Sequence, residues 1–128
     1  MISHLSFGVG DLARAQRFYD AALAPLGVVR VWSAADRAGY GPAGGEDGLA
    51  LKLRSESSPP GPGFHCAFDA PSRAAVDAFH RAALAYGGED NGPPGVRPHY
   101  GEHYYAAFVT DPDGHRIEAL CQRPGADA

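Results

Sequence analysis

Two histidines and one glutamate of this chain have side chains that can bind a divalent metal ion: His4, His65 and Glu118. Two imidazoles and one carboxylate can occupy one face of an octahedral ion and leave the other positions open for a substrate. A plainer interpretation is that each histidine is a half-buried polar residue of a strand and that Glu118 forms an ion pair with Arg116 or Lys52. The elements that position these residues bear on the choice.

The chain is predicted to contain two copies of one strand–helix–three-strand unit. A shift of 61 positions takes His4 to His65 and superposes the apolar residues and the helix-ending glycines around them. Near the end of each copy a second register superposes segment 47–52 on segment 113–118. The expected strands are 1–9, 28–33, 37–41, 48–54, 64–70, a short one near 89, 104–110 and 115–121, and the expected helices are 12–26 and 72–86. A long loop that contains Pro93, Pro94 and Pro98 is expected after the strand near 89.

These elements predict a single domain. The first module covers residues 1–54, and the second covers 64–123. A linker rich in Ser, Pro and Gly joins them over 55–63, and residues 124–128 form a tail.

The alternation of apolar residues predicts which side chains face away from the helices. A helix covers one face of each sheet, so the bulky apolar residues of every strand must point toward it. This reasoning places His4 and Ser6 of the first strand on the open face, together with His65, Arg116 and Glu118 of the second module. The residues expected on the covered face are Leu5, Phe7, Val9, Phe64, Cys66, Phe68, Ile117, Ala119 and Cys121.

Composition excludes several classes of protein. The 128 residues carry a net charge of −4, and Lys52 is the only lysine, so we expect no nucleic-acid partner. No apolar run approaches the ~20 residues of a membrane span, and the first residues do not resemble a signal peptide. Cys66 and Cys121 lie in apolar segments, which predicts buried free thiols in a cytoplasmic protein.

The chain resembles the vicinal oxygen chelate superfamily, which includes glyoxalase I, bleomycin-resistance proteins and extradiol dioxygenases. The resemblance covers nearly all of 1–123, and segments 4–9, 18–19, 64–68 and above all 111–118 carry it. It implies an α+β fold in which two βαβββ modules form a curled mixed sheet around a cleft. It also implies metal ligands on the first and fourth strand of each module, and His4, His65 and Glu118 match three of those four positions.

Several positions depart from the patterns of individual subfamilies. The second register places Lys52 where glyoxalase I carries Glu or Gln, and a protonated ammonium cannot bind a cation. Dioxygenases and thiol transferases of the superfamily have a Tyr at the place of Phe108, although Tyr104 shares its strand phase and can supply a hydroxyl. Thiol transferases have a Thr at the place of Ser6. His99 and His103 are candidates for the extra acid/base histidine of dioxygenases, in an aromatic loop that either covers the cleft or packs elsewhere.

The resemblance implies a divalent-metal enzyme that acts on a small oxygen-bearing metabolite as a lyase, isomerase, dioxygenase or thiol transferase. Mn(II) or Fe(II) suits the ligand set best, with Zn(II) or Ni(II) as alternatives. Glu118 would double as the base, and Lys52 and Arg116 would neutralise an anionic substrate group. The alternative is a metal-free drug- or metabolite-binding protein in which a Lys52–Glu118 ion pair takes the place of the metal.

The small members of the superfamily commonly pair the first module of one chain with the second module of another. We therefore expect a homodimer whose two sites are shared between chains, with His4 coming from one subunit and His65 and Glu118 from the other. Open sheet edges favour such association, and the Pro-rich linker is extended enough to reach across.

Overall fold

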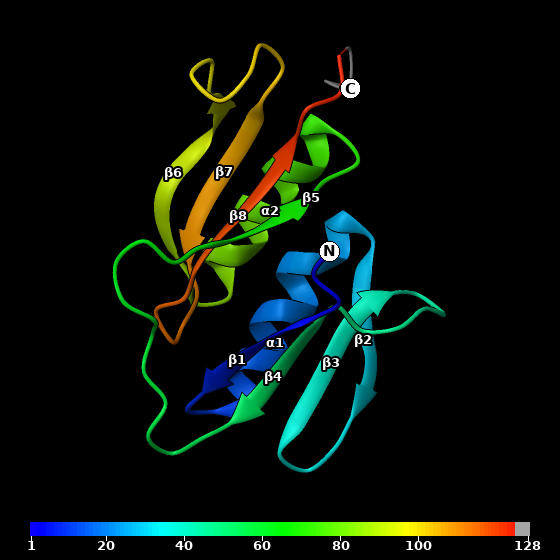
Figure 1. Ribbon diagram of the computed structural model, residues 1–128, viewed down its shortest axis with the longest axis vertical. Helices are drawn as coiled ribbons and strands as arrows, with labels where there is room; N and C mark the ends of the chain where they lie inside the picture. Colours follow the sequence, from blue (N-terminus) through cyan, green and yellow to red (C-terminus); the bar gives the residue numbers. More distant parts are fainter. Residues whose placement is uncertain (125–128) are drawn as a thin grey trace.

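The computed structural model describes residues 1–124, which form two modules of the same topology (Figure 1). This confirms the α+β class and the repeat. The first module contains β1 (Leu5–Val9), α1 (Leu12–Leu23), a 3-10 turn (Ala24–Leu26), β2 (Val28–Ser33), β3 (Arg37–Pro42) and β4 (Leu49–Leu53). The second contains β5 (Cys66–Asp69), α2 (Arg73–Ala85), β6 (Glu89–Val96), β7 (Tyr105–Thr110) and β8 (Arg116–Cys121). Most of the predicted tail lies outside the described residues.

Each module has one four-stranded mixed sheet. The strand order is β1-β4-β3-β2 in the first sheet and β5-β8-β7-β6 in the second. The first strand pairs in parallel with the last strand of its module, and the remaining neighbours are antiparallel. The last strand of each module is therefore central, and its side chains lie between those of the first and third strands.

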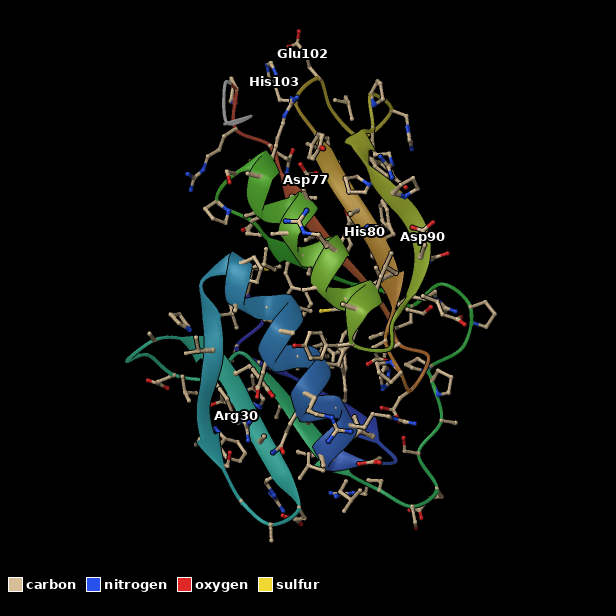
Figure 2. All side chains as sticks on the ribbon, turned by 180° about the vertical axis from the view of Figure 1, so that it is seen from behind. Arg30, Asp77, His80, Asp90, Glu102 and His103 are labelled. Atoms are coloured by element: carbon tan, nitrogen blue, oxygen red, sulfur yellow. The ribbon has the colours of Figure 1, made fainter. Side chains whose placement is uncertain are left out.

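The two helices lie on the same side of the molecule, and both sheets turn their other face away from them (Figures 1 and 2). Asp11 caps α1 by accepting from the Arg14 N–H at 3.0 Å, and Ser72 caps α2 by accepting from the Ala75 N–H at 3.1 Å. The helices pack against each other, so both modules share one core. The helix residues in that core are Leu12, Ala15, Phe18, Tyr19, Ala22, Leu23, Ala75, Val76, Phe79 and Ala83.

A buried joint connects the turn before β8 to the first module. The Tyr19 hydroxyl donates to the Asp111 carboxylate at 2.6 Å. His115 stacks on Phe7, with ring centroids 4.5 Å apart, and its Nε2 donates to the Gly8 carbonyl at 2.8 Å. His115 is buried against the shared core.

The segment after α2 is a strand for eight residues, and the prediction of a long loop there was wrong. Pro93 and Pro94 occur inside β6 because β6 is an edge strand, where a missing N–H breaks no ladder. The register with β7 shifts between Asp90 and Gly92 and again between Gly92 and Gly95, so the strand is bulged twice.

The strands next to the two predicted histidine ligands are shorter than expected. β1 begins at Leu5 and β5 at Cys66, so His4 and His65 both precede their strands. Tyr86 is 52% exposed because it lies beyond the last turn of α2, and His80 is hydrogen-bonded to Asp90 of β6. Both cysteines are free thiols, as expected, and no helix within the described residues is long and apolar enough to cross a membrane.

Candidate functional site

A row of four residues crosses the second sheet on or beside its open face. Ala67 of β5 pairs with Glu118 of β8, Glu118 pairs with Phe108 of β7, and Phe108 pairs with Gly92 of β6. Directly paired residues of neighbouring strands point to the same face. Ile117 and Ala119, on either side of Glu118, belong to the shared core, so the Glu118 side chain points to the other face. The prediction that Glu118 faces away from the helix is confirmed.

Glu118 is the centre of the site. Its side chain is only 2% exposed, and both oxygens have partners. Oε1 lies 3.1 Å from Nε2 of His65, and Oε2 accepts a short hydrogen bond from the Tyr104 hydroxyl. Burial, followed by this hydrogen bond and the nearby carboxylate charge, raises the pKa of Tyr104 above its ordinary value. Tyr104 therefore stays protonated at neutral pH and keeps donating to Glu118.

A cavity of about 430 Å³ opens above this pair. Its volume lies in the range of small-molecule sites, which are mostly apolar with a few placed polar groups. The walls combine aromatic rings with polar groups, among them His65, Asn91, Tyr100, Tyr104, Phe108 and Glu118. Tyr104 and Phe108 both line this cavity, and the Tyr104 hydroxyl reaches Glu118.

Arg116 lines the cavity, and its guanidinium also donates to backbone carbonyls. Its Nε donates to the Phe64 carbonyl at 2.9 Å, and one terminal nitrogen donates to the Gly61 carbonyl at 2.6 Å. Those carbonyls belong to the segment that leads into His65. The guanidinium thus attaches the linker to β8 and fixes the backbone just before His65.

The predicted position of Lys52 is wrong by two residues. Ser6 pairs with Ala50, and its counterpart in the second module, Ala67, pairs with Glu118. Ala50 is therefore the residue equivalent to Glu118, and Lys52 lies two positions further along the open face of β4. The expected Lys52–Glu118 ion pair is not among those formed within residues 1–124.

The first module contributes no side chain to this cavity. His4 is exposed and contacts Ser3, and Ser6 is exposed on β1. Trp32 is only partly buried, and its indole occupies the space beside Gly39, the cross-strand partner of Ala50. Trp32 therefore lies on the open face of the first sheet, on the same side as Ala50.

The histidines of the loop between β6 and β7 lie outside the cavity lining. His103 is 3.4 Å from Glu102, and both lie at the tip of this loop (Figure 2). The His99 ring contacts the Tyr100 ring at a tilt of 42°, and Tyr100 does line the cavity. In this arrangement the loop contributes Tyr100 and Tyr104 to the site.

Two of the three predicted metal ligands are close enough to share an ion. Metal–ligand bonds of about 2.0–2.2 Å place neighbouring ligands of an octahedral ion about 3 Å apart. His65 Nε2 and Glu118 Oε1 are separated by 3.1 Å, so one ion can bind both with little movement. Within residues 1–124 no group of three His, Cys, Asp or Glu side chains is assembled for a metal.

Asn91 is a polar residue of the cavity lining that the sequence did not point to, and Phe64 and Ile117 line the cavity although they were expected on the covered face. The segment containing Asn91 was interpreted as a loop because of the adjacent glycines and prolines. The glycines and prolines of segment 90–95 could have identified it. Next to a predicted strand these residues also indicate a bulged edge strand, which would have placed Asn91 on the sheet.

Comparisons with known proteins agree with this geometry. A model of the Glyoxalase/Bleomycin resistance protein/Dioxygenase superfamily matches residues 1–119. A glyoxalase/bleomycin resistance protein from Albidiferax ferrireducens is 35% identical, with a TM-score of 0.81, over 95% of this chain and 98% of that chain. None of the curated proteins matches the chain.

Two less similar structures share the fold. A glyoxalase-related enzyme from Fulvimarina pelagi is 22% identical, with a TM-score of 0.74, over 100% of this chain and 95% of that one. A glyoxalase I mutant from Zea mays is 22% identical, with a TM-score of 0.70, over 93% of this chain and 46% of that one. The family match over most of the chain and the similarity to the Albidiferax ferrireducens protein show that this chain belongs to the glyoxalase/bleomycin resistance protein/dioxygenase superfamily.

Proposed function

We propose that the protein is a divalent-metal-dependent enzyme that acts on a small oxygen-bearing molecule. The observation that carries the proposal is the 3.1 Å separation of His65 Nε2 and Glu118 Oε1 at the base of a cavity. Imidazole and carboxylate ligands favour Mn(II) or Fe(II), with Zn(II) or Ni(II) as alternatives. The ion would supply Lewis-acid chemistry by polarising a substrate oxygen.

Residues of the second module would orient the metal ligand, accept the proton and enclose the substrate. Tyr104 holds Oε2 of Glu118, and Oε1, which lies beside His65 Nε2, would bind an ion or accept a proton from the substrate. The aromatic walls exclude water around the substrate. Because Ala50 stands where the first module would carry a second carboxylate, the site favours reactions that need one base over a proton shuttle between two bases.

The third ligand is proposed to be His4 of a second copy. The open faces of the two sheets lie on the same side of one chain rather than opposite each other (Figure 1). A two-fold axis can place the first module of one copy over the second module of another, which gives two equivalent sites. His4 is exposed and has room to take part.

Metal titration tests the ligand set. His65→Ala should weaken Mn(II) binding without unfolding the protein. Loss of a residue that only hydrogen-bonds a metal ligand costs about 10–100-fold in metal affinity, and loss of a ligand itself should cost more. His103→Ala is the matched control. The one ion pair that His103 forms within residues 1–124 is with Glu102, away from the cavity lining. Equal Mn(II) affinities of the two variants would contradict the assignment.

Sharing between chains is tested by mixing His4→Ala protein with His65→Ala protein under conditions of subunit exchange. In each mixed dimer one site would be complete and the other would lack both histidines, so Mn(II) binding should partly recover. No recovery in verified mixed dimers would show that His4 does not complete the site.

A metal-free binding protein is the second candidate. It is favoured by the absence of a carboxylate at Ala50 and by the partners that Glu118 already has within the chain. Metal analysis after purification without chelator or affinity tag distinguishes the two. Substoichiometric metal that does not rise on addition of Mn(II), Fe(II), Zn(II) or Ni(II) would favour binding without chemistry.

A further inference from the structure

The far end of the cavity from Glu118 is formed by a β-bulge in β6. Asn91 lies between Asp90 and Gly92, where the register with β7 shifts, so it is the extra residue of the bulge. Asn91 is one of the residues that line the cavity, and it is exposed. Its amide makes none of the side-chain hydrogen bonds found within residues 1–124. Bulges beside active sites commonly redirect a side chain in this way.

Two contacts hold the bulge in place. The Asp90 carboxylate accepts from the Gly92 N–H at 3.0 Å, and the same oxygen lies 2.9 Å from Nε2 of His80 on α2. Figure 2 shows His80 pointing from the helix toward Asp90 at the edge of the sheet. The bulge is therefore tied to the helix layer, and Asn91 is presented on a supported backbone rather than on a free loop.

Gly92 leaves room for the Arg97 side chain next to Asn91. Its φ of 151° is unusual for residues with a side chain, and a Cβ atom there would lie 3.0 Å from the Phe108 ring and 3.3 Å from Nη2 of Arg97. The Arg97 guanidinium lies over the Phe108 ring, with Cζ 5.3 Å from the ring centroid, and donates to the Pro93 and Gly95 carbonyls. Asn91 lines the cavity and Arg97 is not among the lining residues, so a ligand that extends from Glu118 past Phe108 meets the Asn91 amide at this end.

The sheet itself sets the length of such a ligand. Glu118, Phe108 and Gly92 are directly paired on three adjacent strands. Adjacent strands are about 4.8 Å apart, so two spacings separate the ends of this row by about 10 Å. That span fits one aromatic ring with a polar group at each end.

We propose that Asn91 determines substrate specificity by hydrogen-bonding an uncharged polar group at the far end of a flat aromatic substrate. This inference rests on the proposed function, because it places the oxygen end of the substrate at the metal position of His65 and Glu118. The ring lies against Phe108 and Tyr100. An amide both donates and accepts, so it suits a carboxamide or a similar neutral group better than a charge.

Three probes of increasing length test the proposal on Mn(II)-loaded protein by calorimetric titration. Acetohydroxamic acid carries the chelating oxygens alone, benzohydroxamic acid adds the ring, and 4-carbamoylbenzohydroxamic acid adds the amide. We expect the carbamoyl group to tighten binding to the wild type by about 5–10-fold, as one net hydrogen bond does. In Asn91→Ala this gain should disappear, while the affinity for acetohydroxamic acid stays the same.

Glu89→Ala is the matched control, since Glu89 is exposed on the same strand and is not part of the cavity lining. It should retain the full carbamoyl gain. An equal gain in the wild type and Asn91→Ala, or no gain in either, would overturn the role of Asn91 while leaving the metal function intact. Failure of acetohydroxamic acid to bind would overturn the proposed function and, with it, the placement of the substrate.

Discussion

Ala50 and Glu118 occupy equivalent positions in the two modules, each paired with the matching residue of the first strand. We therefore predict that Ala50→Glu, rather than Lys52→Glu, creates a set of four ligands like that of glyoxalase I. If sites are shared between copies, Ala50→Glu should raise the affinity for Zn(II) or Ni(II) by about 10-fold or more, since each added anionic ligand favours a divalent ion. Calorimetric titration of both variants checks this.

Lys52→Glu serves as the control for charge. It makes the net charge of the same face more negative than Ala50→Glu does, but it does not place a carboxylate at the ligand position. A larger gain in Zn(II) or Ni(II) affinity for Lys52→Glu than for Ala50→Glu would contradict the assignment of Ala50, by the pairing of β1 with β4, as the residue equivalent to Glu118.

Tyr104→Phe should weaken metal binding. The change removes the hydroxyl that donates to Glu118 but keeps the ring. Loss of a partner that orients a ligand typically costs about 10–100-fold in metal affinity. Mn(II) titration of Tyr104→Phe beside Tyr100→Phe, whose hydroxyl makes no contact with Glu118, measures the effect. Unchanged affinity in Tyr104→Phe would argue that the hydroxyl leaves Glu118 when the metal binds.

Arg116→Lys should loosen the linker. A lysine keeps the charge but cannot donate to the Phe64 and Gly61 carbonyls with the fork of a guanidinium. We expect faster proteolysis within 55–63, together with lower metal affinity because His65 follows directly. Arg123→Lys is the control, since Arg123 makes one hydrogen bond to Pro71. Cleavage at the same rate in both variants would contradict the role of Arg116 in fixing the linker.

Asp111→Asn should change how stability depends on pH. Burial raises the pKa of Asp111 despite the opposing hydrogen bond from Tyr19 and the nearby His115. The unfolded carboxyl loses its proton near pH ~4, whereas the folded one keeps it to higher pH. The contribution of Asp111 to stability is therefore complete at low pH and is lost as pH rises through the folded pKa.

Relative to Asp111→Asn, the wild type should lose free energy of unfolding between pH 4 and pH 7. Urea unfolding curves at intervals across this range measure the difference between the two proteins. A wild type that gains stability relative to the variant as pH rises would contradict the predicted direction.

The sequence predicted which faces of the strands carry the site, because alternation along a strand reflects burial directly. His65 and Glu118 could be placed on the open face in this way. The same alternation could not show that Lys52 had been assigned in place of Ala50 as the residue equivalent to Glu118. A shift of two residues keeps a side chain on the same face, so only the ladder between β1 and β4 could identify Ala50.

Contacts made by irregular segments could not be predicted. Arg116 was correctly placed beside Glu118, but the path of the linker across β8 depends on tertiary structure. The prolines of 93–98 indicated a loop, and only the edge position of β6 allows them in a strand. The strand assignment in turn determines that Asn91 faces the cavity.

The packing of α1 against α2 has a consequence for folding. Each helix buries its apolar face partly against the other module, and Tyr19 and His115 connect the two through buried groups. A fragment cut at the linker would expose part of this shared interior to water. The two halves should therefore melt together in one cooperative transition, and they would fold only as an obligate pair even though their topologies are the same.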